Sequence, residues 1–174
     1  MALTLEKGPL ATTMGDIARR AGVQRITLYR HFGDEQSLHR AAAQYCFARF
    51  PPPDAAVLEG IADPMARTRA ALERLYAHWE RMAPLARPII RDADVAPAKI
   101  SLRTRDEYTG AIRGTVARGF RAAVRRRPAF RDALRHAIDW RTWDSLDRAG
   151  FARRRAVQLM SRLVAAAAAT NRAH

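Results

Sequence analysis

Large apolar side chains recur every three or four residues along most of the chain, which is the spacing of one helix face. In the C-terminal two thirds, this spacing predicts helices from Pro64 to Pro84, from Lys99 to Arg126, from Pro128 to a stop at Gly150, and over about 152–168. Alanine, arginine and leucine dominate the composition, whereas glycine and proline number nine each and β-branched residues are sparse. Because those three residues are strong helix formers, the sequence predicts an all-α protein.

Three consecutive prolines, Pro51 to Pro53, interrupt this pattern. Proline does not continue a helix, and the residue before a proline is pushed toward extended geometry. We interpret the segment as a connector between two domains. These are a head at residues 1–50 and a helical body at residues 51–174.

The head contains the start and stop signals of three short helices. Thr13 followed by Asp16 has the spacing of a capping box and opens a helix over 14–21. Two further helices are expected over about 24–31 and about 35–48, and Asp34 is the expected N-cap of the second of them.

The first two of these helices and the glycine between them have the pattern of a helix-turn-helix. Gly22 supplies the left-handed backbone of a tight turn, and Ala18 is small enough for two helices to cross closely. The residues expected to face inward are Ile17, Ala21, Val23, Leu28 and Phe32. The second helix then presents a guanidinium, an apolar tip, a hydroxyl and a phenol, which suit base edges and phosphates in a major groove. These outward residues are Arg25, Ile26, Thr27, Tyr29 and Arg30.

The formal net charge of +14 changes this picture little. Residues 1–50 carry 7 basic and 4 acidic side chains, whereas residues 51–174 carry 24 and 13, so most of the excess lies in the body. Net charge alone supports nonspecific attraction to a polyanion.

Composition argues against several other classes of protein. The single cysteine, Cys46, excludes an intrachain disulfide framework and a zinc site of several thiolates, so we expect neither metal nor cofactor. The sequence has no run of 18 apolar residues and no secretory leader pattern, so we expect a cytoplasmic protein with no membrane partner. It also has no phosphate-binding loop and no activated nucleophile, so we do not expect an enzyme.

Three aligned pieces of the head resemble the DNA-binding domain of the tetracycline-repressor (TetR) family of regulators. They are Ala11-Thr12-Thr13-Met14, the turn Asp16-Ile17-Ala18…Ala21-Gly22-Val23, and Thr27-Leu28-Tyr29-Arg30-His31-Phe32. The resemblance covers about residues 5–45, and the body is similar in layout alone. It implies a homodimer that binds double-stranded operator DNA, with a body that binds a small-molecule effector and changes the spacing of the two heads.

The resemblance also implies roles for individual side chains of the head. Those that correspond to phosphate contacts are Thr13, Tyr29 and His31. Those that correspond to groove-facing residues are Arg25, Ile26, Thr27 and Arg30. Arg25 is the best candidate for binding a guanine, because a guanidinium bonds that base with two hydrogen bonds.

The head departs from the family pattern in two places. Glu35 stands where the family usually has a lysine that meets phosphate, and a carboxylate there repels DNA. The helix with which the family begins is shortened in this chain, where the segment that contains Leu3 and Leu5 gives about one and a half turns. We therefore expect a head of marginal stability.

The body is expected to hold an effector pocket and a dimer interface. Aromatic side chains turned inward from three helical segments leave an apolar cleft that suits a small ligand. The expected lining residues are Tyr76, Trp79, Tyr108, Ile112 and Trp140. The last two predicted helices have apolar stripes that an isologous two-fold interface buries. These stripes consist of Trp143, Leu146, Val157, Met160, Leu163 and Val164.

Two alternatives to a repressor that its effector releases from DNA stay open. In the first, the effector acts as a corepressor and strengthens DNA binding. In the second, the chain is an N-terminally shortened regulator that dimerises and binds operators weakly.

Overall fold

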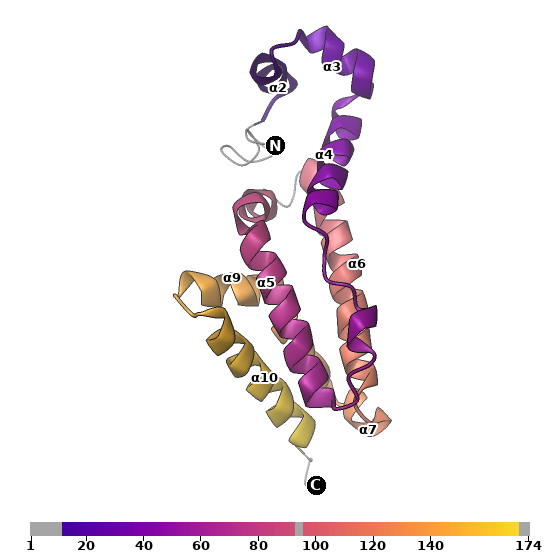
Figure 1. Ribbon diagram of the computed structural model, residues 1–174, viewed down its shortest axis with the longest axis vertical. Coiled ribbons are helices and arrows are strands. Elements are labelled where there is room, and N and C mark those ends of the chain that lie inside the picture. The colour runs from indigo at the N-terminus through magenta and orange to yellow at the C-terminus, as the bar shows by residue number, and fades with distance from the viewer. Residues whose placement is uncertain (1–11, 93–95, 171–174) are drawn as a thin grey trace. The chain divides into compact units, whose positions relative to one another are not determined.

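The structure is a computed structural model that describes residues 12–92 and 96–170, and all regular elements within these ranges are helices. In chain order they are α2 (Met14–Ala21), α3 (Arg25–Phe32), α4 (Glu35–Arg49), the 3₁₀ turn η1 (Ala56–Leu58), α5 (Pro64–Arg91), α6 (Ala96–Arg118), α7 (Ala122–Arg125), α8 (Pro128–Ala137), α9 (Trp140–Arg148) and α10 (Arg153–Ala169) (Figure 1). The all-α fold class is confirmed. The predicted short first helix with Leu3 and Leu5 lies outside the described residues.

The chain divides into two compact units. The first unit combines residues 1–51 with 81–106, and the second unit combines residues 52–80 with 107–174. Helices α5 and α6 are therefore each divided between the two units. The division into a head at 1–50 and a body at 51–174 stays a prediction.

Helix α5 continues past Pro84 and Pro88 to Arg91, so the prediction that Pro84 ends it is wrong. A proline inside a helix removes one N–H donor and crowds the carbonyl four residues earlier, which for Pro84 is that of Glu80. The flanking residues Met82, Ala83 and Leu85 are buried, and this burial favours continuing the helix across the defect. The boundary between the two units falls directly after Glu80.

The single helix predicted for residues 99–126 is two helices, because α6 ends at Arg118 and α7 begins at Ala122. The last turn tightens, as the N–H groups of Gly119 and Phe120 bond carbonyls three residues earlier at 3.1 and 3.0 Å. A Cβ atom on Gly119 would lie 3.3 Å from Nη1 of Arg67. That guanidinium donates to the carbonyl of Thr115 at 3.2 Å, so it occupies the space beside the helix end.

The helix predicted from Pro128 to Gly150 is also two helices, α8 and α9. Asp139 is the N-cap of α9, and its Oδ1 accepts hydrogen bonds from the backbone N–H groups of Arg141 and Thr142 at 2.7 and 3.4 Å. An aspartate in this position is a common helix start. Apolar residues recur at helical spacing on both sides of this break, so the spacing alone did not indicate it.

The core of the second unit is built around Trp79 of α5, which is fully buried. Its ring lies 5.7 Å from Tyr76, 5.7 Å from Trp140 and 5.9 Å from Trp143, measured between ring centroids. Two polar groups of this cluster are paired. The indole N–H of Trp79 donates to the hydroxyl of Tyr108 at 3.0 Å, and the hydroxyl of Tyr76 donates to the carbonyl of Ala137 at 2.9 Å.

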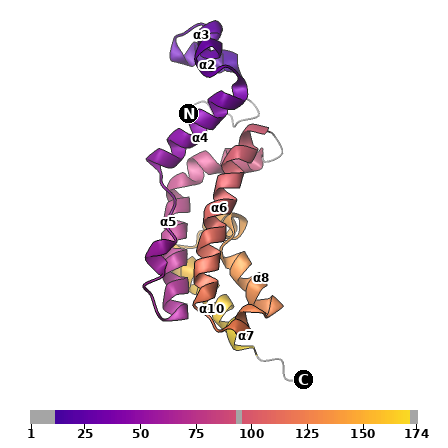
Figure 2. The ribbon, with the colours of Figure 1, turned by 90° about the vertical axis from the view of Figure 1, so that its right-hand side faces the viewer.

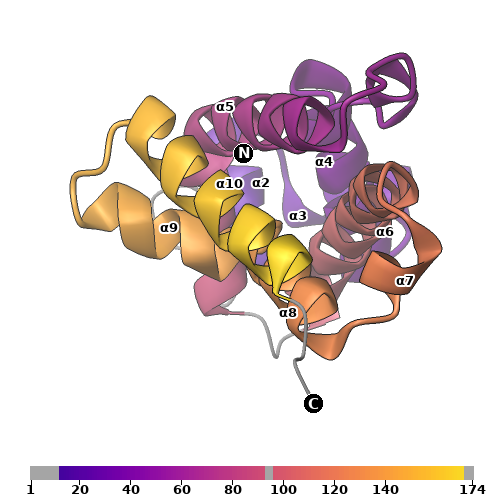
Figure 3. The ribbon, with the colours of Figure 1, turned by 90° about the horizontal axis from the view of Figure 1, so that it is seen from below.

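Helix α10 packs along α8, as two views of the second unit show (Figures 2 and 3). Two arginines fix its ends. Nη1 of Arg127 donates to the carbonyls of Ala168 and Thr170 at 2.8 and 3.0 Å, which satisfies acceptors at the C-terminus of the helix. Arg153 at the other end bonds two glutamates of α5, Glu73 at 3.2 Å and Glu80 at 2.6 Å.

Replacing Tyr76 by phenylalanine tests whether this hydrogen bond stabilises the aromatic core. Burial, and then the nearby Asp139, raise the pKa of the Tyr76 phenol, so the group is a neutral donor across the physiological pH range. Tyr76→Phe leaves the buried carbonyl of Ala137 unpaired and is expected to cost about 1–3 kcal/mol in the free energy of unfolding. Urea unfolding followed by tryptophan fluorescence measures this cost. Tyr45→Phe, at a position that is 60% exposed, is the matched control, and equal stability of the two variants would contradict the assignment.

Candidate nucleic-acid interface

Helix α2 begins with the capping box that the sequence predicted. Oγ1 of Thr13 accepts a hydrogen bond from the backbone N–H of Asp16 at 3.1 Å, and the Asp16 carboxylate accepts from the backbone N–H of Thr13 at 3.3 Å. The Thr13 hydroxyl also donates to the same carboxylate at 2.8 Å. Thr13 is exposed at the helix start.

The turn between α2 and α3 depends on Gly22, whose φ of +67° lies in the left-handed region. The N–H of Val23 donates to the carbonyl of Ala18 at 3.1 Å, and the N–H of Gly22 donates to that of Arg19 at 3.3 Å. This pair of bonds is a Schellman motif, which ends a helix and reverses the chain within two residues. The predicted end of the helix and the role of Gly22 are therefore confirmed.

A small apolar cluster fixes α3 against α2. Its buried members are Met14, Ala18 and Leu28, and its half-buried members are Ile17, Tyr29, Phe32 and Leu38. Ala21 and Val23, which were expected to face inward, are exposed, with Val23 at 39%, so that expectation is wrong. The Schellman turn places both residues on its outer side. Met14 occupies the inner position that the sequence reasoning missed.

The outward face of α3 contains the side chains predicted to contact DNA. Arg25, Ile26, Thr27, Arg30 and His31 are exposed, and Ile26 reaches 60%. An isolated isoleucine so exposed on a helix of eight residues suits contact with a thymine methyl group. The His31 ring meets Phe32 edge to face at 4.6 Å.

Tyr29 differs from this set because its ring is half-buried in the cluster. Its hydroxyl accepts a hydrogen bond from Nη2 of Arg25 at 3.1 Å, and the guanidinium carbon lies 5.4 Å from the ring centroid. The two residues are four apart and share one helix face. Tyr29 thus holds the guanidinium of Arg25 along the surface of α3. The spacing could have indicated this pair, but the sequence reasoning assigned each residue separately.

The N-terminus of α3 is suited to an anion. No acidic residue lies in its first turn, and its N-cap, Gln24, makes no side-chain capping bond. Backbone N–H groups at such a helix start, together with the helix dipole, favour a phosphate.

The start of α4 is acidic instead. Oδ1 of Asp34 accepts from the N–H of Ser37 at 2.6 Å, and this hydrogen bond lowers the pKa of the carboxyl group. Glu35 follows in the first turn and lies 3.6 Å from Nε2 of His39. Both carboxylates suit the helix dipole, and they limit phosphate binding at this end of α4.

The residues predicted for the effector pocket form the aromatic core of the second unit. Tyr76, Trp79, Ile112 and Trp140 are each at most 4% exposed, and Tyr108 is half-buried. The rings of Tyr76 and Trp140 contact that of Trp79, whose indole N–H bonds Tyr108. The cavities of about 860, 500 and 890 Å³ are lined by other residues. Their role in binding an effector stays a prediction.

The residues predicted for the dimer interface are mostly inside the second unit. Trp143, Val157, Met160 and Val164 are at most 7% exposed, and Leu146 is half-buried. Leu163, at 38% exposed, is the one that faces outward. The sequence reasoning missed Leu159, one turn before it, which is 42% exposed.

Among residues 12–92 and 96–170, no three histidine, cysteine, aspartate or glutamate side chains lie close enough together to hold a metal ion. No helix in that part of the chain has the length and apolar character needed to cross a membrane.

Comparison with known proteins bears directly on this surface. Residues 1–42 match the family model described as "Bacterial regulatory proteins, tetR family". No curated protein matches the chain. Among solved structures, the chain is similar to the crystal structure of a TetR family transcriptional regulator, PfmR from Thermus thermophilus. The TM-score is 0.56 and the identity 22%, and the match covers 95% of this chain and 92% of that one.

The chain is all-α, and the second helix of its helix-turn-helix exposes Arg25, Ile26, Thr27 and Arg30. Together with the family match at residues 1–42, these features support a DNA-binding transcriptional regulator. The likeness to PfmR establishes the fold of the whole chain, and the family match covers the helix-turn-helix. The match to the TetR family model at residues 1–42 agrees with the resemblance of the N-terminal motifs.

Two glycines of one helix-turn-helix test the importance of the turn. Gly22→Ala forces a side chain into the left-handed region, and we expect it to destabilise the α2–α3 pair by about 1–2 kcal/mol. Gly15→Ala lies within α2, where a Cβ would meet Oγ1 of Thr13 at an ordinary 3.6 Å, and we expect neutral or increased stability. Hydrogen exchange of the amides in α2 and α3 reports the difference, and equal protection in both variants would contradict the role of Gly22.

Proposed function

We propose that this regulator is a ligand-responsive repressor that binds a palindromic operator as a homodimer, with one α3 helix in each of two major grooves. The observation that supports it most is the outward face of α3. There a guanidinium, an apolar side chain and a hydroxyl are presented from a helix whose inner face is locked by a buried cluster. Such a set offers both hydrogen bonds and apolar contact to base edges. Repression and ligand binding are typical of the TetR family.

We assign the sequence-reading role to Arg25, Ile26, Thr27 and Arg30, and the phosphate-binding role to Thr13, Tyr29 and His31. Arg25 reaches a base only if its guanidinium leaves the Tyr29 hydroxyl or bonds both at once. Thr13 reaches a phosphate through its backbone or through a hydroxyl that now donates to Asp16. The operator lies on cellular DNA, so we assign the protein to the cytoplasm.

The dimer interface is proposed on the outer face of α10. Leu159 and Leu163 are one helical turn apart and are the large apolar side chains that this helix leaves exposed. Beside them, a groove of about 890 Å³ runs between α8 and α10, lined in part by Leu163, Ala166 and Ala133. A two-fold contact would place the leucines of one protomer against small residues of its partner. Of the residues predicted for this role, Leu163 faces outward, whereas Trp143, Val157, Met160 and Val164 are buried within one protomer.

Replacing Arg25 tests base reading by α3. An operator is first selected from random DNA duplexes with the wild-type chain. Arg25→Ala is then expected to cost about 1–3 kcal/mol in binding and to relax the preference at one base pair of each half-site. His31→Ala should weaken binding to all sequences alike, because phosphate contacts carry little sequence information.

Arg49→Ala, at the exposed end of α4, removes the same charge and serves as the control. It is expected to keep the base preference of the wild type. The proposal fails if Arg25→Ala changes affinity no more than Arg49→Ala does and leaves the base preference intact.

Charged residues at the two leucines test the interface. Leu159→Glu combined with Leu163→Glu is expected to give monomers at micromolar concentration, because an isologous contact brings the new carboxylates together in an apolar setting. Light scattering measures the mass. Val57→Glu, at another apolar side chain that is 51% exposed, should remain a dimer. A double variant that stays dimeric would exclude this face of α10.

A further inference from the structure

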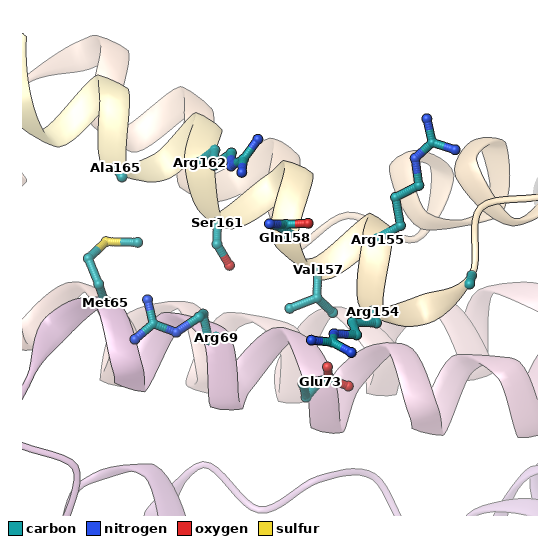
Figure 4. Close-up of a pocket in the computed structure, with 11 residues that line it drawn as sticks. Met65, Arg69, Glu73, Arg154, Arg155, Val157, Gln158, Ser161, Arg162 and Ala165 are labelled. Carbon is teal, nitrogen blue, oxygen red and sulfur yellow. The ribbon is translucent and has the colours of Figure 1, made fainter.

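A second groove of the second unit lies between α5 and α10, on a different side of α10 from Leu159 and Leu163. It has a volume of about 860 Å³. Figure 4 shows Met65 and Arg69 pointing from α5 toward α10, and Val157 and Ser161 pointing from α10 toward α5. The residues that build it are separate from the aromatic core around Trp79.

Ser161 is the unusual residue of this groove. It is 5% exposed, and its Oγ has no hydrogen-bond partner. A buried hydroxyl without a partner is destabilising, and native structures pair almost all such groups. The flexible side chains of Met65 and Arg69 face it from the opposite wall, so a ligand that moves them aside reaches the hydroxyl.

The charges along the groove favour an anion. Glu73 is the acidic residue of the lining, and it is bonded by Arg153 at 3.2 Å. Arg69 faces the groove, and its distance to Asp63 is 3.9 Å with both side chains more than half exposed, which makes a weak ion pair. Arg154 adds a further guanidinium to the same lining. The lining has four arginines, Arg69, Arg154, Arg155 and Arg162, against this one glutamate, so the charge of the site is net positive.

The remaining lining is apolar. Met65, Val157 and Ala165 give a surface that suits a hydrocarbon or aromatic ring. We propose that the groove between α5 and α10 binds a small organic anion with an apolar body, whose charged group meets Arg69 and the Ser161 hydroxyl. Binding supplies the partner that this hydroxyl lacks. The groove would serve as the effector site of the proposed repressor, and only that role rests on the proposed function.

Two fluorescent probes that differ by one charged group test the site without DNA. The probes are 8-anilinonaphthalene-1-sulfonate and N-phenyl-1-naphthylamine, which has the same rings and no sulfonate. The sulfonate should bind the full-length chain more tightly than the neutral probe. Arg69→Gln should weaken the sulfonate about tenfold, the effect of losing one charge-assisted hydrogen bond, and leave the neutral probe unchanged.

Three more variants distinguish binding in this groove from nonspecific attraction of the sulfonate probe to a basic protein. Arg74→Gln, at an exposed arginine of α5 outside the groove lining, should leave both probes unaffected. Ala165→Phe fills the groove and should abolish binding of both. Ser161→Ala should weaken the sulfonate and raise the melting temperature of the unliganded chain, because it removes the unpaired hydroxyl.

Two results would overturn the proposal. One is equal weakening of the sulfonate by Arg69→Gln and Arg74→Gln, which would indicate charge attraction alone. The other is normal sulfonate binding to a folded Ala165→Phe variant, which would place the probe elsewhere. Since no DNA is present, either result leaves the proposed operator binding standing.

Discussion

The left-handed turn at Gly22 is the constraint on which the DNA-binding surface depends. It lets the N–H groups of residues 22 and 23 bond the last carbonyls of α2, so the chain reverses at once and α3 crosses α2 at Ala18. The crossing buries Leu28, and the opposite face of α3 is consequently turned to solvent. The chemistry of that face follows from this geometry. Leu28 is buried and Tyr29 and Phe32 pack in part against the same cluster, whereas Arg25, Ile26, Thr27, Arg30 and His31 stay exposed.

The second unit is held by polar groups that close an apolar core. Tyr76 and Trp79 bury large rings and also donate hydrogen bonds to Ala137 and Tyr108, so the core has one favoured arrangement. Arg67 has a similar role near the start of α5, where it donates to the carbonyls of Glu59, Ile61 and Thr115. Helix α10 lies on this framework, with one face buried, one face lined by exposed leucines and one face on the groove that contains Ser161.

Local signals in the sequence predicted the helix-turn-helix well. The cap at Thr13, the turn at Gly22 and the cap at Asp34 each involve residues within five positions, so short-range chemistry decides them. The outward set on α3 also followed from helical spacing. The exposure of Val23 was not predicted, because it depends on the exact path of the turn.

Features that depend on tertiary packing were predicted less well. Pro84 does not end α5, since buried neighbours on both sides outweigh the loss of one hydrogen bond. At the break after Arg118, Gly119 lies against Arg67, which is 52 positions earlier in the chain and so outside the reach of local sequence signals. Apolar stripes marked Trp143 and Val157 correctly as buried, but periodicity does not tell whether a side chain is covered by its own chain or by a partner. The exposure of Leu159 and the missing hydrogen-bond partner of Ser161 depend on how α10 packs, so the sequence did not indicate them.

The ratio of two affinities tests the central claim most directly, because a chain with a net charge of +14 also attracts any DNA. The measurement compares binding to the selected operator with binding to a scrambled duplex of the same length and composition, at one physiological salt concentration. If α3 reads bases in two successive grooves, the operator should bind about a thousandfold more tightly or better. Nearly equal affinities for the two duplexes would show that the protein binds DNA by charge alone and would contradict the account.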